Sequence, residues 1–362
     1  MAQFLTNERF GNGSDGAYAP STGTDAPIDS ACTGTISTTS LSATNVSFTA
    51  GQIIMIHQTR GTGAGQWELN VIASYTAGTI TTKYALTYGY VSGAQVLVVS
   101  QHSTGLIDTG VTIKSKGWNG TVGGIYAKAA TGLFSIVGTL SATGSSASGQ
   151  TEGTADGGFD GGAVPGSGSG NCGEGTSGAS TQQSSANGNG GGGGSTTGSG
   201  AGGGNGTGGA SGSGVSPGTG GGTSGNSGLT LMTFGGAGGS AVQGGNGGGA
   251  AGGGIVFIFA KTISVTGSVT STGGTGGNGT NYGGGGGAGG SILFKGQSIT
   301  LGSSLVTAAG GAGGTGGSNA GGAGGNGRIH ADYSNSISGS TSPALDSTQD
   351  STLTDAFYGS MI

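Results

Sequence analysis

Charged residues are scarce in this sequence. Of its 362 residues, only 9 are Lys or Arg and 14 are Asp or Glu, and the basic residues form no cluster that could follow a phosphate backbone. Aromatic residues are also few, at 6% of the chain. These two shortages exclude nucleic acid as an expected partner and argue against one large apolar core along the whole chain.

The sequence also lacks a long apolar run. Its first residues, MAQFLTNERFGNG, place Glu8 and Arg9 where a secretory signal peptide would need apolar residues. No later stretch has the length of a membrane span. We therefore expect neither Sec-dependent export nor membrane insertion. An extracellular type of composition without a signal favours a virion component released by lysis over a substrate of signal-independent secretion.

Cysteine is limited to two residues, Cys32 and Cys172, which lie 140 positions apart. This spacing matches neither a metal site nor a redox motif. The simplest interpretation is two free thiols, and a pairing between them stays open at this point.

Residues that could bind metal or phosphate form no convincing motif. Glu152, Asp156 and Asp160 are spaced by four, but no EF-hand or GGxGxD loop accompanies them, so a solvated acidic patch is favoured over a calcium site. GxGxxG strings occur through composition alone, and none opens a helix after a strand. We expect no metal site and no cofactor.

Catalytic groups are equally sparse. Hydrolysis of a glycan requires two neighbouring carboxylates, yet after Glu174 the next acidic residue is Asp332. His57 alternates with apolar residues in a predicted strand, which is typical of a structural histidine. The sequence therefore predicts a non-enzymatic protein with no catalytic residues.

Glycine, in contrast, is abundant, with 95 residues that lie mostly after Thr143. Before that point the chain reads as ordinary β structure, because the segments 46–59, 67–86 and 94–103 are rich in β-branched and aromatic residues, with Ala77-Gly78 as a hairpin turn. These segments predict a small antiparallel barrel or sandwich.

An internal repeat follows. The segment IVFIFAKTISVTGSVTSTGG from Ile255 aligns at an offset of 36 with SILFKGQSITLGSSLVTAAGG from Ser291, which superposes Val256 on Ile292 and Ile263 on Ile299. A degenerate copy starts at Arg328, and an earlier one covers 123–144. One β element thus occurs about four times.

The tracts between the repeats have a period of three. From Gly310 the chain reads GGA GGT GGS NA GGA GGN G, and similar triplets start at Gly235 and Gly273. Three residues per turn is the repeat of the polyproline II helix, so each tract predicts two extended legs joined by a short turn. The triplets are poor over 150–225, where a flexible linker is the alternative.

The triplet G-G-X explains the need for glycine. A polyproline II leg has no internal hydrogen bonds, so its backbone must pair with neighbouring legs, and only faces without side chains approach closely enough. Two faces of each leg would then be bare, while the third carries X. The X residues are small and mostly polar: Ala312, Thr315, Ser318, Asn278 and Asn326.

With these tracts in view, residues 144–340 resemble the glycine-rich receptor-binding adhesins at the tips of bacteriophage long tail fibres. That resemblance implies a sandwich of polyproline II helices whose variable turns recognise a glycan or protein receptor on the host surface. The turns that match its recognition turns here consist of Ala241, Val242 and Gln243, of Thr280, Asn281 and Tyr282, and of Ser318, Asn319 and Ala320.

Taken together, the sequence predicts an all-β protein in four parts. These are an extended docking arm for a virion or fibre protein (1–30), an antiparallel barrel or sandwich (31–122), β repeats interleaved with a polyglycine II bundle (123–340) and a C-terminal tail (341–362).

The competing class is a structural subunit of a surface filament or capsid decoration, and homo-oligomers are compatible with both classes. In that case the arm and the apolar stretch Leu229–Phe234 would form intersubunit contacts. An ice-binding protein is a third class, disfavoured because X is mixed and does not form a uniform Thr or Ala array.

Overall fold

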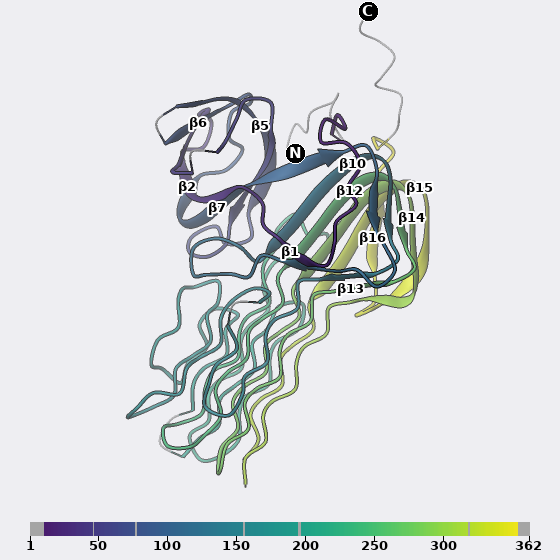
Figure 1. Ribbon diagram of the computed structural model, residues 1–362. Coiled ribbons are helices and arrows are strands. Elements are labelled where there is room, and N and C mark those ends of the chain that lie inside the picture. The colour runs from purple at the N-terminus through teal and green to yellow at the C-terminus, as the bar shows by residue number, and fades with distance from the viewer. Residues whose placement is uncertain are drawn as a thin grey trace, which may run out of the picture.

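The computed structural model describes residues 11–353 except 46, 77, 155, 195, 196 and 318. The described chain is all-β and contains no helix, as the sequence predicts. It has three parts: a barrel, a stack of parallel strands, and a bundle of extended glycine-rich legs that runs away from this stack (Figure 1). We call the repeating unit of the stack, a long strand followed by a short one, a β coil.

Six strands close an antiparallel barrel in the order β2-β3-β6-β5-β4-β7, and β7 pairs back onto β2. Its interior is filled by side chains such as Leu41, Ile54, Ile56 and Val96. The strands are β2 (Asp29–Gly34), β3 (Ser40–Ala43), β4 (Ile53–Gln58), β5 (Trp67–Thr76), β6 (Thr79–Thr82) and β7 (Tyr90–His102). Gly78 joins β5 to β6 with a φ of 84°, which favours glycine; its predicted turn partner Ala77 lies outside the described residues.

The repeated β element forms parallel strands in the predicted register. Val256 pairs with Ile292 and Ile263 with Ile299, while Phe134 of the earliest copy pairs with Ile263. These long strands are β10 (Ile125–Ile136), β12 (Ile255–Val265), β14 (Ser291–Thr307) and β15 (Arg328–Ser342). Two shorter strands flank this layer, β8 (Gly105–Ile107) beside β10 and β16 (Asp346–Gln349) beside β15.

A second, smaller layer covers one face of these strands. It consists of β1 (Gly23–Asp25), β9 (Thr112–Ser115), β11 (Thr139–Ser141), β13 (Ser268–Thr270) and the end of β14. The core between the layers includes Val256, Ile258, Val269, Ile292 and Phe294. Because consecutive residues of β12 point to opposite faces, Phe257 and Phe259 pack instead toward the barrel.

The glycine tracts form the predicted out-and-back legs. In the tract between β13 and β14, Gly284, Gly287 and Gly290 donate backbone hydrogen bonds of 2.8–2.9 Å to residues 277, 274 and 271 of the preceding leg. Every third residue therefore faces the same neighbour, as polyproline II geometry requires. The tracts 235–254 and 308–327 are built in the same way.

The leg 283–290 lies inside the bundle and has six hydrogen-bonded neighbours. Its N–H groups donate to three legs, and its carbonyl groups accept from three others. Any Cβ placed on Gly285 would stand 1.9 Å from the backbone oxygen of Ala201, and one on Gly287 would stand 1.9 Å from that of Ala251. Only glycine fits at these two positions, although the same leg accommodates the buried Ala288.

Residues 158–234 are not a flexible linker, which was the alternative for 150–225. Where described, they form further legs of the bundle: Gly200 and Gly203 donate to the carbonyl groups of Gly283 and Gly286 at 3.1 and 3.0 Å. The triplets are poor here because some of these legs lie at the surface, where small side chains such as Thr219 are exposed.

The X residues follow the prediction only on the outer legs. Asn278, Thr315 and Asn326 are exposed, but Ala237 and Ser240 of the interior leg 235–242 are fully buried. An interior leg has no open face, so its X positions accept only residues that fit among neighbouring backbones.

The predicted docking arm is part of the fold where it is described. Asp15 N donates to the Gln101 carbonyl at 2.9 Å, Tyr18 N donates to the Thr104 carbonyl at 2.8 Å, and β1 pairs with β9. The extended backbone finds its partners at strand edges of the same chain. The predicted tail likewise begins inside β15 and continues into β16; residues 1–10 and 354–362 of the two segments lie outside the described residues.

Candidate functional site

The turns of the three glycine hairpins meet at the end of the bundle remote from the β coils (Figure 1). Thr280 N donates to the Gly245 carbonyl at 2.9 Å, and Gly317 N donates to the Thr280 carbonyl at 3.0 Å. A backbone bridge also joins Tyr282 to Asn319. We call this surface the tip; its three turns are residues 243–245, 280–282 and 316–320, of which Ser318 is not described.

Asn246 holds two of these turns together. Its side-chain Oδ1 accepts from the backbone N–H groups of Asn281 and Tyr282 at 3.2 and 3.1 Å, and its Nδ2 donates to the carbonyl groups of Val242 and Gln243 at 3.1 and 2.9 Å. Asn246 is only 3% exposed. The sequence analysis missed this residue, although its signal is visible as the Asn of the first triplet after the turn.

The predicted recognition residues divide into two groups. The side chains that face solvent at least in part are Gln243, Thr280, Asn281, Tyr282, Asn319 and Ala320. Ala241 and Val242 are instead buried, at 0% and 6% exposure. Their backbone N–H groups donate to the carbonyl groups of Gly247 and Gly198, so both residues still belong to the leg, and their burial argues against a direct contact with a receptor. Ser318 lies outside the described residues.

Two further turns reach the tip from the part of the chain with poor triplets. Gly168 N donates to the Gln243 side-chain oxygen at 3.0 Å, and the Ser213 hydroxyl donates to the Ala320 carbonyl at 2.6 Å. The second turn exposes Val215, whose side chain is 86% exposed. Sequence reasoning missed both turns because their Pro-Gly and Ser-Gly pairs lie outside a clear triplet frame.

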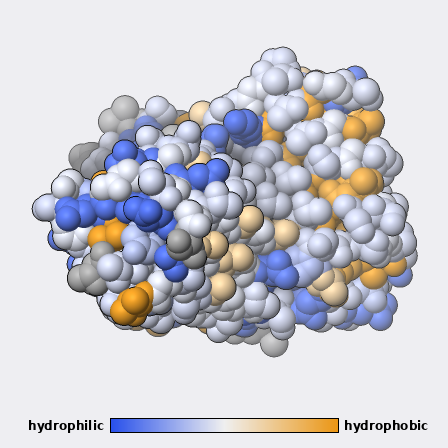
Figure 2. Space-filling view, turned by 90° about the horizontal axis from the view of Figure 1, so that it is seen from below, coloured by the Kyte–Doolittle hydropathy of each residue, from blue (hydrophilic) through white to orange (hydrophobic). Residues whose placement is uncertain are grey.

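The tip carries almost no charge. Residues 175–260, 262–294 and 296–327 contain no Asp, Glu, Lys, Arg or His, so Tyr282 is the one ionisable side chain of the three central turns. Seen from below, the molecule is mostly pale to blue with separate small orange spots (Figure 2). Such a surface offers hydroxyl and amide groups, with isolated apolar side chains between them.

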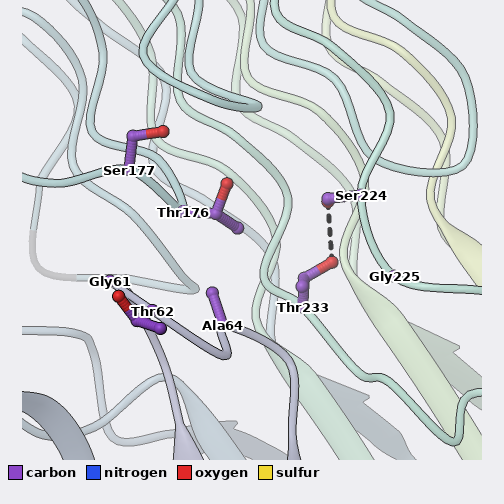
Figure 3. Close-up of a pocket in the computed structure, with 8 residues that line it drawn as sticks. All are labelled: Gly61, Thr62, Ala64, Thr176, Ser177, Ser224, Gly225 and Thr233. Atoms are coloured by element: carbon purple, nitrogen blue, oxygen red, sulfur yellow. Dashed lines mark hydrogen bonds between the residues drawn. The ribbon is translucent and has the colours of Figure 1, made fainter. Parts of the chain in front are cut away.

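A separate cleft of about 510 Å³ lies at the other end of the bundle, beside the barrel. Thr62 and Ala64 come from the loop between β4 and β5, Thr176 comes from a turn of the bundle, and Ser224 and Thr233 flank the opposite wall (Figure 3). The Ser224 and Thr233 hydroxyls bond to each other at 2.8 Å. The lining is uncharged and contains no candidate nucleophile with an adjacent base.

Polar groups near this cleft have structural roles. Glu174 receives hydrogen bonds from Arg60 at 3.0 Å and from the Trp118 indole at 2.8 Å, which ties the bundle to the barrel. His57 is fully buried between Thr59 and the Met232 carbonyl, at 2.9 and 2.8 Å. It is the structural histidine that the sequence indicated.

Other candidate groups form no reactive centre in the part of the chain that the structure describes. Asp156 pairs with Lys114 at 3.3 Å, and no three His, Cys, Asp or Glu side chains are placed to hold a metal ion among the described residues. Cys32 and Cys172 are buried free thiols. Burial raises the pKa of Cys32, which disfavours its reactive thiolate form.

In comparisons with known proteins, no family model, no curated protein and no solved structure matches this chain. Within residues described by the structure, no helix is long and apolar enough to cross a membrane.

Proposed function

We propose that this chain is a non-enzymatic adhesin of a virion fibre that binds a receptor on a host cell surface through the turns of the tip. The observation that carries the proposal is the convergence of turns from separate parts of the chain at one end of a hydrogen-bonded bundle. Its expected partners are a surface glycan or protein and, toward the virion, another fibre protein.

The bundle suits this role because its legs provide a rigid support and its turns carry the exposed side chains. The legs hold their neighbours at every third residue, so the turns are fixed relative to each other before a ligand arrives. The turn residues themselves make few side-chain contacts and can change without disturbing the legs. Tyr, Asn, Gln and Ser side chains contact ligands with little loss of conformational entropy.

Tyr282 is the central candidate for a direct contact. It is half-buried, its backbone is held by Asn246, and it is the aromatic residue of the central turns. An aromatic side chain of this kind typically supplies much of the affinity of a recognition surface.

One argument for the competing function, a structural subunit of a filament or capsid, no longer holds. Leu229, Met232 and Phe234 are fully buried and pack between the barrel and the β coils. The apolar stretch that would have served as an intersubunit contact is therefore used within the chain.

The test exchanges the exposed turn residues while leaving the legs intact. Thr280–Tyr282 become Gly-Ser-Gly and Asn319-Ala320 become Gly-Ser, with Asn246 retained. The labelled wild-type chain is first applied to a panel of bacterial cells to find a strain that it binds. We expect the exchanged variant to melt as the wild type does and to lose binding to that strain, because its recognition side chains are gone.

The matched control changes exposed residues on the flank of the bundle. Thr275→Ala and Ala312→Ser alter two outer positions away from the turns and should leave binding unchanged. Retained binding by the exchanged variant would contradict the proposal and move recognition to the barrel. Tyr282→Ala alone should weaken binding by about tenfold or more, as loss of an anchoring aromatic does.

A further inference from the structure

Lys128 lies almost entirely inside the protein. Its Nζ is 2.8 Å from Oδ1 of Asp25, and the two side chains are only 6% and 12% exposed. Lys128 belongs to β10, whereas Asp25 ends β1, in the segment that leads into the barrel. This contact joins two strands that do not pair with each other along the backbone.

Aromatic rings surround the pair. Nζ of Lys128 lies 5.3 Å from the ring centre of Tyr18 and 5.4 Å from that of Tyr126. Burial raises the pKa of Tyr18 to about 12 and raises the pKa of Tyr126 well above its ordinary value, so both phenols stay neutral. A charged pair in such surroundings is costly, and neutral products are favoured over separated charges.

The carboxyl group of Asp25 is incompletely satisfied. Its second oxygen, Oδ2, is buried and has no hydrogen-bond partner within the described structure. His102 stacks on Tyr18 with ring centres 4.9 Å apart. Unpaired buried polar atoms are rare in folded proteins and call for an explanation.

We propose that Lys128 and Asp25 join spontaneously into an intramolecular isopeptide bond. The geometry favours the reaction, because Nζ lies 2.8 Å from an oxygen that is bonded to the carboxyl carbon, so the two reacting groups are already held together. Lysine amines are established nucleophiles toward carbonyl carbon once they lose their proton in an apolar site.

The reaction needs no external reagent. One proton passes from Nζ to the carboxylate of Asp25, which gives a neutral amine and a neutral acid. The nitrogen lone pair then attacks Cγ, a second proton moves from nitrogen to the departing hydroxyl group, and the C–O bond breaks. The net change converts an ammonium and a carboxylate into one amide and one water.

The bond would close a covalent loop around the barrel, from residue 25 to residue 128. Pulling on the N-terminal segment would then load β10 through Asp25 as soon as Gly23 and Thr24 separate from β9, and the barrel would carry no force. This inference stands apart from the proposed receptor function, since it concerns only the chain's own residues.

The decisive measurement is the intact mass of the denatured wild-type chain. We expect a mass lower by about 18 Da than the sequence requires, the loss of one water on amide formation. Trypsin should then yield a branched species that joins residues 10–60 to 117–261, because an acylated Lys128 is not a cleavage site. A full sequence mass would overturn the proposal, as would a loss of water located in an unbranched peptide.

Variants separate the bond from the ion pair. Lys128→Arg keeps the positive charge but removes the amine nucleophile, and Asp25→Ala removes the carbonyl; both should have their full sequence mass. Asp25→Asn should still react, with a loss of about 17 Da as ammonia leaves instead of water.

Discussion

Even in an outer leg of the bundle, a glycine that faces a neighbouring leg leaves no room for a side chain. A Cβ on Gly314 would lie 2.0 Å from the oxygen of Gly277, and one on Gly313 would lie 2.0 Å from that of Gly321. The Gly277 oxygen accepts a hydrogen bond from Gly284 N at 2.9 Å, so it cannot move away without breaking that bond. Thr315, one position later, is exposed.

We therefore predict opposite outcomes for adjacent substitutions. Gly314→Val should destabilise the protein by about 3 kcal/mol or more, because overpacking separates two legs along their whole length. Thr315→Val should cost less than about 1 kcal/mol, since it loses only the hydroxyl bond to Asn278. Thermal melting of both variants gives the comparison, and equal melting temperatures would contradict the triplet geometry.

At the scale of the element, the unit of this fold is a coil of one long strand, one short strand and one glycine hairpin. Successive coils stack through parallel pairing, with Ile299 between Ile263 and Ile337 in the same row. Apolar side chains between the two strand layers hold each coil, and hydrogen bonds between backbones hold each hairpin.

This division predicts a large effect for a single core residue. Ile299 is 1% exposed, so Ile299→Ala should lower the free energy of unfolding by about 2–5 kcal/mol, through lost burial and a cavity. Leu133 of β10 is 44% exposed, and Leu133→Ala should change the free energy of unfolding by about 0.5 kcal/mol or less. Denaturant titration measures both; a small effect at Ile299 would mean that the coils have no core.

At the scale of the whole molecule, barrel, coils and bundle share one interface. Leu229, Met232 and Phe234 pack there against Met55 and Phe257. The His57 imidazole and the Trp67 indole bond to the carbonyl groups of Met232 and Leu229, at 2.8 and 2.9 Å. The segment 229–234 of the glycine-rich half thus joins the bundle to the barrel.

The buried histidine at this interface predicts a pH dependence of stability. Burial lowers the pKa of His57 from 6.5 to about 4, although the bond to Met232 opposes the shift. Between these values the unfolded chain binds a proton that the folded chain does not, so the free energy of unfolding falls as pH falls from about 6.5 to 4. The expected loss is about 3 kcal/mol at 1.36 kcal/mol per pKa unit.

The measurement is denaturant unfolding of the wild type and of His57→Gln across this pH window. The variant should keep the smaller contribution of His102, whose pKa is also lowered, and lose the part due to His57. Identical slopes for the two proteins would show that His57 does not titrate on unfolding.

The sequence by itself determined the repeat and its register. An offset of 36 aligned Val256 with Ile292, and those residues are partners in the sheet, because parallel coils of equal length place equivalent positions side by side. The triplets determined the legs, since only glycine permits backbones to approach at every third residue. The β-rich segments before residue 123 determined an antiparallel domain, though not its closure into a barrel.

Only the tertiary structure decided which turns share a surface and which residues they expose. Ala241 and Val242 looked like turn residues because they interrupt a triplet, yet the leg continues through them and neighbouring backbones cover them. Asn246, Val215 and the pair of Lys128 with Asp25 depend on contacts between distant segments. A local pattern specifies the conformation of a leg, but which legs become neighbours depends on how all of them pack together.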